Sequence, residues 1–365
     1  MLTLLFAAAI ALTFTLVLTP VFAKAFRSLN LGQFVRADTP TTHVVKRGTP
    51  SMGGVVFITA AIIGYFGGHL INQTTPSLSG LLVIFMMVGL GLVGFIDDLL
   101  KVTRQNSLGL HGTFKIIFTV IVSSVFAVLA VNATDINGVQ VASTSVSFIR
   151  DLPVDFVLLF GGIGGIIALV AWISLITVST SNAVNLTDGL DGLAAGSSIF
   201  AIGSFIIIGF WQFNQSCFGA GIAAENMFKC YTVAAPMDFA VAAAAVVGAL
   251  IGFLWWNTSP AQIIMGDTGS FALGGALAAL AIVSRTELLL IFLGGLFLIV
   301  TSQVIMQRIY FKATKGKRIW RASPLHHHFE MKNWPEVTIV VRFWIISGLC
   351  VSAGVGIFYL EWLSL

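Results

Sequence analysis

The chain has 365 residues, of which 57% are hydrophobic and only 9% are charged. A soluble globular protein carries about 25% charged residues, so this composition excludes a soluble body, and it also excludes intrinsic disorder and a nucleic-acid-binding domain. The net charge of +4 is interpreted as a determinant of membrane orientation.

Apolar runs long enough to span a membrane recur along the whole chain. A span needs about 20 mainly apolar residues, and a helix satisfies its own backbone hydrogen bonds in hydrocarbon. We therefore expect an all-α polytopic membrane protein, forming one domain over residues 1–365, with about ten transmembrane helices. In chain order the expected spans are Leu2–Ala23, Gly53–Ile71, Leu78–Leu100, Phe114–Val131, Phe156–Val178, Leu193–Phe213, Phe239–Trp256, Ser270–Val283, Leu288–Tyr310 and Val337–Tyr359.

Two glycine-rich stretches modify these spans. The Gly294-Gly295 pair predicts a break or tilt in the ninth span. The GGIGG stretch at 161–165 lies in the fifth span, where its small residues predict close helix packing.

The distribution of basic residues predicts the orientation. Sixteen Lys and Arg fall in one set of connections, and only Arg150, Lys229 and Arg285 fall in the other. Because cytoplasmic loops carry the excess of Lys and Arg, we place the first set in the cytoplasm, which puts both termini outside.

The cysteines leave one question open. Cys217 and Cys230 share an outward loop that faces an oxidising space, so they form either a disulfide or two free thiols. Cys350 lies in the last span and is interpreted as a packing residue.

Acidic residues gather at the cytoplasmic ends of the spans. Asp97 and Asp98 close the third span in GFIDDLLK, Asp188 and Asp191 lie in NAVNLTDGLDGL, and Asp267 lies in MGDTGS. Carboxylates at a membrane are costly and are kept for function. Their placement at one depth is the main functional signal in the sequence.

Five acids at one interface suit a hard cation. Mg²⁺ uses one or two protein carboxylates and fills its shell with waters and substrate phosphates. Asp97 and Asp98 point about 100° apart on a helix, so one can face a cavity while the other orients a neighbour. Gly266 and Gly269 beside Asp267 permit a phosphate to approach closely. The pattern predicts a phosphate–metal site.

Basic and imidazole groups supply a second signal. PLHHHFE, residues 324–330, follows a run of basic residues in the last cytoplasmic connection. Its consecutive histidines cannot share a helix face, which disfavours a zinc site, and they suit contacts to phosphate. The basic run itself is typical of contact with anionic lipid. Lys46 and Arg47 in KRGTPSMGG can also contact phosphate.

Two other classes of protein compete with an enzyme. A transporter needs polar residues near the bilayer midplane and repeated halves, whereas the acids of this chain lie at one face. A structural membrane protein has no need for clustered carboxylates.

Together these motifs carry a resemblance to a known family. KRGTPSMGG, GFIDDLLK, NAVNLTDGLDGLA, FLWWNTSPAQIIMGDTGS and PLHHHFE, spread over residues 46–330, resemble the phospho-N-acetylmuramoyl-pentapeptide transferase family of the polyprenyl-phosphate N-acetylhexosamine-1-phosphate transferase superfamily. A sibling that transfers GlcNAc-1-phosphate is the nearest alternative, because DDxxK and NxxNxxDG fit the whole superfamily.

The resemblance implies a ten-helix, Mg²⁺-dependent enzyme of the bacterial cytoplasmic membrane, with its active site on the cytoplasmic face. Its substrates are UDP-MurNAc-pentapeptide and undecaprenyl phosphate, and its products are lipid I and UMP. The expected partners are these substrates and membrane lipids, without nucleic acid, and a homodimer stays open. Either the lipid phosphate attacks directly, which we favour, or an aspartate attacks first.

Site residues follow from the matching motifs. Asp267 resembles the Mg²⁺ ligand, Asp97 the acid nearest the lipid phosphate, and Asp98 the second acid of the pair. The remaining matches are substrate-binding residues. They comprise the nucleotide-pocket residues Asn185, Asp188, Asp191 and Asn257, the cationic contacts Lys46 and Lys101, and His326 and His327 near the sugar–phosphate end. Two positions depart from the family pattern: Ile264 replaces a usual aromatic residue, and Ser51 replaces a common Thr.

Overall fold

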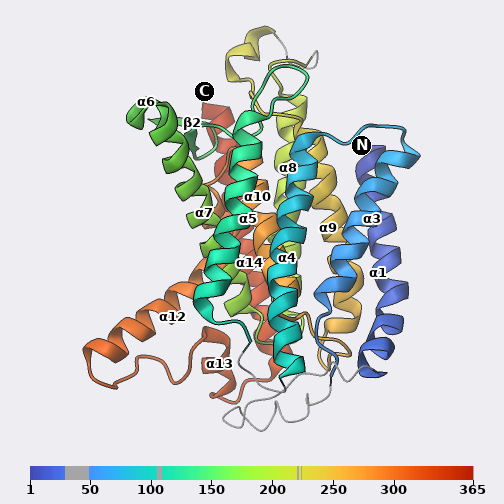
Figure 1. Ribbon diagram of the computed structural model, residues 1–365, viewed down its shortest axis with the longest axis vertical. Coiled ribbons are helices and arrows are strands. Elements are labelled where there is room, and N and C mark those ends of the chain that lie inside the picture. The colour runs from blue at the N-terminus through green and yellow to red at the C-terminus, as the bar shows by residue number, and fades with distance from the viewer. Residues whose placement is uncertain (29–48, 105–108, 220–221, 223, 365) are drawn as a thin grey trace.

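The protein is a bundle of long helices (Figure 1). Its computed structural model describes residues 1–28, 49–104, 109–219, 222 and 224–364. Nine of the described helices are long and apolar enough to cross a membrane, which confirms the all-α polytopic architecture. They are α1 (Leu2–Ser28), α3 (Gly54–Ile71), α4 (Leu78–Thr103), α5 (Gly112–Asn132), α7 (Gly162–Thr187), α8 (Leu193–Asn214), α9 (Pro236–Asn257), α10 (Gly266–Val283) and α14 (Glu336–Ser364).

Shorter elements complete the chain. Two strands form a small antiparallel hairpin, which the sequence analysis did not anticipate. The shorter elements are β1 (Ser145–Ser147), β2 (Asp151–Asp155), α6 (Phe156–Phe160), the 3₁₀-helix η1 (Ala224–Lys229), α11 (Leu290–Leu293), α12 (Gly295–Ala313) and α13 (Leu325–Glu330).

The ninth expected span is broken at the predicted glycine pair. α11 ends at Leu293 and α12 begins at Gly295, so the predicted break is confirmed. α12 carries Gln303, Gln307 and Arg308 in its middle, which make it less apolar than the nine spanning helices. Figure 1 shows α12 leaving the bundle at an angle.

The fifth expected span starts differently from the prediction. The backbone at Gly161 has φ of 74°, which separates α6 from α7. A single helix from Phe156 to Val178 was therefore wrong at its start, because this left-handed conformation interrupts the helix and glycine adopts it readily. The predicted close packing is confirmed only at Gly165, where a Cβ would lie 2.4 Å from Val157 Cα in α6, whereas a Cβ on Gly161 or Gly162 would meet no described atom within 4 Å.

α9 and α10 form the centre of the bundle. In the most apolar 18-residue stretch of each helix, 78% of the residues of α9 and 89% of the residues of α10 are buried inside the protein. Small residues bring α9 against α1, since a Cβ on Gly248 would lie 2.2 Å from the Ala8 carbonyl oxygen. The central helix α10 is consequently surrounded by other helices along most of its length.

Both chain ends lie at the same end of the bundle in Figure 1. This arrangement agrees with an even number of crossings, while the compartment that each end faces stays a prediction. The loop after α8 contains a disulfide between Cys217 and Cys230, with a Cα–Cα distance of 4.9 Å, and Cys350 is a free thiol. The disulfide alternative is thus confirmed.

Candidate active site

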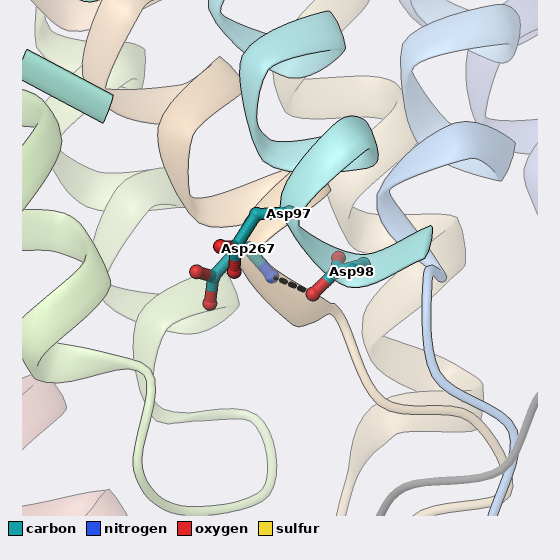
Figure 2. A group of neighbouring side chains, drawn as sticks. All are labelled: Asp97, Asp98 and Asp267. Carbon is teal, nitrogen blue, oxygen red and sulfur yellow. Dashed lines mark hydrogen bonds between the residues drawn. The ribbon is translucent and has the colours of Figure 1, made fainter. Parts of the chain in front are cut away.

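α4 and α10 cross at a glycine, and this crossing assembles the site. A Cβ on Gly94 would lie 2.1 Å from the carbonyl oxygen of Asp267, so a larger residue would force the helices apart. Asp97 and Asp98 follow on α4, and Asp267 lies in the first turn of α10. Figure 2 shows the three carboxylates side by side, although Asp98 and Asp267 are 169 residues apart in the chain.

Asp98 caps the N-terminus of α10 from the neighbouring helix. Its Oδ2 accepts hydrogen bonds from the Thr268 amide at 2.9 Å and the Thr268 hydroxyl at 2.7 Å, and its Oδ1 accepts from the Asp267 amide at 3.2 Å. An anion at a helix N-terminus is stabilised by the unpaired amides and the helix dipole. Asp98 thereby fixes the backbone that carries Asp267.

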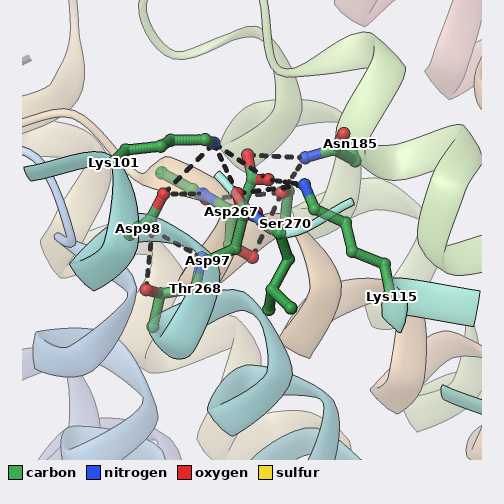
Figure 3. Close-up of polar contacts among 10 residues, drawn as sticks. Asp97, Asp98, Lys101, Lys115, Asn185, Asp267, Thr268 and Ser270 are labelled. Atoms are coloured by element: carbon green, nitrogen blue, oxygen red, sulfur yellow. Dashed lines mark hydrogen bonds and ion pairs between the residues drawn. The ribbon is translucent and has the colours of Figure 1, made fainter. Parts of the chain in front are cut away.

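Two lysines bridge Asp97 and Asp267 (Figure 3). Lys101 Nζ lies 2.6 Å from Asp97 Oδ2 and 3.1 Å from Asp267 Oδ2. Lys115 Nζ, from α5, lies 3.0 Å and 2.6 Å from the same two oxygens. The other oxygen of Asp97 accepts a hydrogen bond from the Leu110 amide at 2.6 Å. Both carboxylates are therefore held in fixed orientations by cationic groups.

Asn185 joins the cluster from the end of α7. Its Nδ2 donates to Asp267 Oδ1 at 3.0 Å and contacts Ser270 Oγ at 2.9 Å. Asp267 thus receives polar contacts from three other helices, α4, α5 and α7. Of the predicted substrate-binding residues, Lys101 and Asn185 contact the carboxylates directly.

The three carboxylates fit a divalent cation. Asp97, Asp98 and Asp267 each offer an oxygen, and these oxygens lie within 4.8 Å of one another. Because two ammonium groups face three carboxylates, the cluster keeps a net negative charge, and its all-oxygen donor set is the kind that hard cations select. The ammonium groups of Lys101 and Lys115 both contact Asp267 Oδ2, so positive charge is stabilised at this oxygen.

A cavity of about 710 Å³ opens beside the cluster. The polar residues that line it include Lys101, Arg104, His111, Lys115, Asn185 and Asp267. Cationic and amide groups around one space suit a ligand that carries phosphate.

Asp188 belongs to the same electrostatic environment. It follows α7 directly at its C-terminal end. Burial raises the pKa of its carboxyl to about 8, and the negative charges of Asp267 and Asp98 contribute to this rise. Added positive charge in the site would favour ionisation of Asp188.

Asp191 and Asn257 connect two loops. Asn257 Oδ1 accepts from the Gly192 amide at 3.1 Å, and its Nδ2 donates to the Ile263 carbonyl at 2.9 Å. Asp191 Oδ2 accepts from the Ala261 amide at 3.1 Å. Both side chains thus position the loop that leads into α10, and their predicted contact with a nucleotide stays a prediction.

Ile264 occupies a backbone junction in that loop. Its amide donates to the Pro50 carbonyl at 2.8 Å, and its carbonyl accepts from the Gly53 amide at 2.8 Å. The segment before α3 is therefore tied to the segment before α10. Lys46 lies outside the described residues, so its predicted role stays a prediction.

α13 places the histidines on the turn after α7. His326 is fully buried, and a Cβ on Gly189 would lie 2.1 Å from its Nε2. His327 Nδ1 lies 2.5 Å from Glu330 Oε2. The structure therefore brings His326 beside the turn that contains Asp188, and it does not include a histidine in the group of carboxylates formed by the described residues.

Lys115 is the residue that the sequence analysis missed. It was counted only as one of the basic residues that set orientation, because a lysine at the end of a span is typical of that role. Its position in the first turn of α5, directly after HGTF, was the sequence feature that placed it at the same end of the spans as the acids.

Comparisons with known proteins agree with this site. Residues 80–285 match glycosyl transferase family 4, and residues 46–58 match the phospho-N-acetylmuramoyl-pentapeptide-transferase signature 1. The chain is similar over its full length to proteins named phospho-N-acetylmuramoyl-pentapeptide-transferase, with 100% of each chain covered. It is 62% identical to that of Clavibacter michiganensis subsp. michiganensis and 52% identical to those of Arthrobacter sp. and Tropheryma whipplei. The chain therefore belongs to the phospho-N-acetylmuramoyl-pentapeptide-transferase family.

Proposed function

We propose that the protein transfers phospho-MurNAc-pentapeptide from UDP-MurNAc-pentapeptide to undecaprenyl phosphate, giving lipid I and UMP. The observation that carries the proposal is the convergence of Asp97, Asp98 and Asp267 with two lysines beside one cavity. An oxygen of the lipid phosphate attacks the β-phosphorus of the nucleotide, and the bond from that phosphorus to the UMP oxygen breaks. UMP leaves with the electron pair of that bond.

Asp267 is the residue that would hold Mg²⁺, with oxygens of Asp97 and Asp98 within 4.8 Å of its own. When bound, the ion neutralises charge on the diphosphate and on the leaving UMP. Asp98 sets the position of Asp267 through the amides at the start of α10. Asn185 restrains the other oxygen of Asp267.

Lys101 and Lys115 stabilise the negative charge that the substrates bring. Both residues line the cavity beside Asp267, so each ammonium group can exchange its carboxylate contact for a phosphate oxygen. Phosphoryl transfer depends mainly on such positioning and charge stabilisation. Two convergent lysines therefore suit a reaction between a diphosphate and a phosphate monoester.

Direct attack by the lipid phosphate is favoured over a covalent intermediate on Asp97. Asp97 Oδ1 accepts from the Leu110 amide, and Oδ2 contacts two lysines. Attack by Asp97 on phosphorus would require one of these oxygens to leave its partners and to line up with the departing UMP. Proton transfer requires only a hydrogen-bonded contact, which Oδ2 can make with the lipid phosphate when a lysine moves to a phosphate oxygen.

The site is proposed to face the cytoplasm of the bacterial cell. The basis is the excess of Lys and Arg in the connections at this end of the spans.

One assay tests the proposal and its nearest alternative. Purified protein, undecaprenyl phosphate and Mg²⁺ are mixed with UDP-MurNAc-pentapeptide or with UDP-GlcNAc, and UMP release is measured. We expect release with the pentapeptide substrate and little with UDP-GlcNAc. Preferential use of UDP-GlcNAc would replace this proposal with the sibling activity.

A further inference from the structure

A second basic region lies on the segment that follows the broken span. Between Glu287 and Glu330 the chain has no acidic residue and six basic ones. The proposed transfer reaction assigns no role to any of them. The basic residues are Arg308, Lys312, Lys315, Lys317, Arg318 and Arg321.

Two glutamines of α12 hold the chain that follows it. Gln307 Oε1 accepts hydrogen bonds from the amides of Ile319 and Trp320, both at 3.1 Å, and its Nε2 donates to the Trp320 carbonyl at 3.0 Å. Gln303 Oε1 accepts from the Ser323 hydroxyl at 3.1 Å. Residues 319–323, which we name the strap, therefore lie in a fixed position against α12.

A cavity of about 310 Å³ lies between α12 and the strap. Arg308 reaches it from the helix and Arg318 from the residue before the strap. The Arg318 guanidinium also lies 5.9 Å from the centre of the Phe311 ring. Two arginines on different segments are thus arranged around one space, which Gln307 also lines.

The two arginines of this cavity form no ion pair with the acids of the described residues. The ion pairs found among the described residues involve neither Arg308 nor Arg318. Guanidinium groups bind phosphate through paired hydrogen bonds. The expected occupant is therefore an anion, and a phosphate ester is the best match.

The surroundings of the cavity indicate where that anion comes from. Ile305, Met306 and Ile309 on α12 are each more than half exposed, and α12 extends away from the bundle in Figure 1. A helix that carries exposed apolar residues beside basic ones is typical of the boundary between lipid headgroups and acyl chains. A phospholipid presents both a phosphate and acyl chains at this depth.

We propose that the cavity between α12 and the strap binds the phosphate of an anionic phospholipid from the surrounding bilayer. Arg308 and Arg318 contact the phosphate, and the exposed apolar residues of α12 contact the acyl chains. None of the residues that line this cavity lines the one beside Asp267. The lipid is therefore a resident of the bilayer that binds apart from the reacting substrates.

Binding can be measured without any turnover. Purified protein in neutral detergent is titrated with phosphatidylglycerol or phosphatidylcholine, each carrying the same acyl-chain fluorophore, and anisotropy is recorded. We expect about tenfold tighter binding of phosphatidylglycerol, with a preference that falls as salt increases. The Arg308→Gln/Arg318→Gln variant should lose this preference. A large excess of inorganic phosphate should not displace the lipid, because it lacks acyl chains.

A matched variant controls for overall charge. Lys24→Gln/Arg27→Gln removes two exposed basic residues near the end of α1 and should keep the preference for phosphatidylglycerol. The proposal is overturned if the unchanged protein binds both lipids equally, if the two double variants behave alike, or if inorganic phosphate displaces the lipid. Equal thermal unfolding temperatures of the three proteins confirm that each variant is folded.

Discussion

Lys115 Nζ lies 2.6 Å from Asp267 Oδ2, at the contact between α5 and the start of α10. The same ammonium group lies 3.0 Å from Asp97 Oδ2. Lys115 therefore holds the acids of two helices together from a third helix. With Lys101 it supplies the positive charge that allows three carboxylates to lie so close to one another.

Replacing Lys115 should reduce turnover more than it reduces stability. Lys115→Gln removes the charge but keeps a hydrogen-bond donor of similar length. Loss of one charge-stabilising donor at a reacting phosphate costs about a hundredfold or more in rate. UMP release by the purified variant provides the measurement, and the thermal unfolding temperature shows whether the fold is retained.

Lys24→Gln is the control for this change, because Lys24 is a basic residue of α1 outside the carboxylate cluster. It should keep normal turnover. A Lys115→Gln enzyme with near-normal UMP release would show that the lysine serves only to balance charge in the unliganded protein.

Replacing Asp267 should weaken Mg²⁺ binding and leave the protein folded. Asp267→Asn keeps the size and the hydrogen-bonding ability of the side chain but removes a charged ligand. We expect a folded protein with no turnover, and weaker Mg²⁺ binding measured by calorimetry. Unchanged Mg²⁺ affinity would remove Asp267 from the set of ligands.

Asp97→Asn tests the proton-accepting role of the neighbouring acid. Loss of a general base typically costs about a hundredfold or more. The rate should also lose the ascending limb of its pH profile, because an amide cannot accept the proton. A variant with a normal rate and a normal pH profile would exclude that role.

The sequence predicted the acids of the site better than the groups that surround them. Asp97, Asp98 and Asp267 stand out because acids are rare in a chain with only 15 of them. Lys115 does not stand out, since a basic residue at the end of a span has a sufficient explanation in membrane orientation. Its role depends on the packing of α5 against two other helices, which local sequence does not reveal.

The local sequence also did not reveal the contacts between loops that are distant in the chain. Asp191 and Asn257 look like free polar groups in their motifs, yet each binds the backbone of a distant loop. Gly161 was expected to lie within a helix, whereas its positive φ ends α6. Such features depend on the tertiary environment, while the apolar periodicity and length of each span depend mainly on local residues.

The α4–α10 crossing should be sensitive to a single methyl group. A Cβ on Gly94 would lie 2.1 Å from the Asp267 carbonyl oxygen and 2.6 Å from the Thr268 amide nitrogen. Gly94→Ala must therefore move α4 away from the catalytic end of α10. We expect a loss of about 1–3 kcal/mol of stability, and a loss of about a hundredfold in turnover, since displacement of reacting groups by about 1 Å has that effect.

Gly203→Ala is a matched control within another buried helix. A Cβ at Gly203 would meet no atom within 4 Å among the described residues. Alanine also favours the helix by about 1 kcal/mol relative to glycine, so this variant should be as stable as the unchanged protein or more so. Thermal unfolding and UMP release of both variants test the comparison, and equal behaviour would show that the crossing tolerates a wider separation.

Glu287 should make stability depend on pH at the opposite end of the bundle. It lies between α10 and α11, is only 7% exposed, and its Oε2 accepts a hydrogen bond from the Ser147 amide at 3.0 Å. Burial raises the pKa of its carboxyl from 4.5 to about 8. The folded protein therefore holds this proton more tightly than the unfolded chain does. Its contribution to stability is complete below about pH 4.5 and is lost as pH rises through about 8.

Glu287→Gln keeps the acceptor for Ser147 but cannot ionise. The variant and the unchanged protein should unfold at similar temperatures in acid, and the variant should unfold at a higher temperature above about pH 8. Glu225→Gln, a change at an exposed acid of η1, should leave the pH dependence of the unfolding temperature as it is. The two proteins share all other titrating groups, so the difference between their unfolding temperatures reports on Glu287. A difference that stays constant across this pH range would mean that Glu287 is already ionised in the folded protein, with its charge stabilised by Ser147 and solvent.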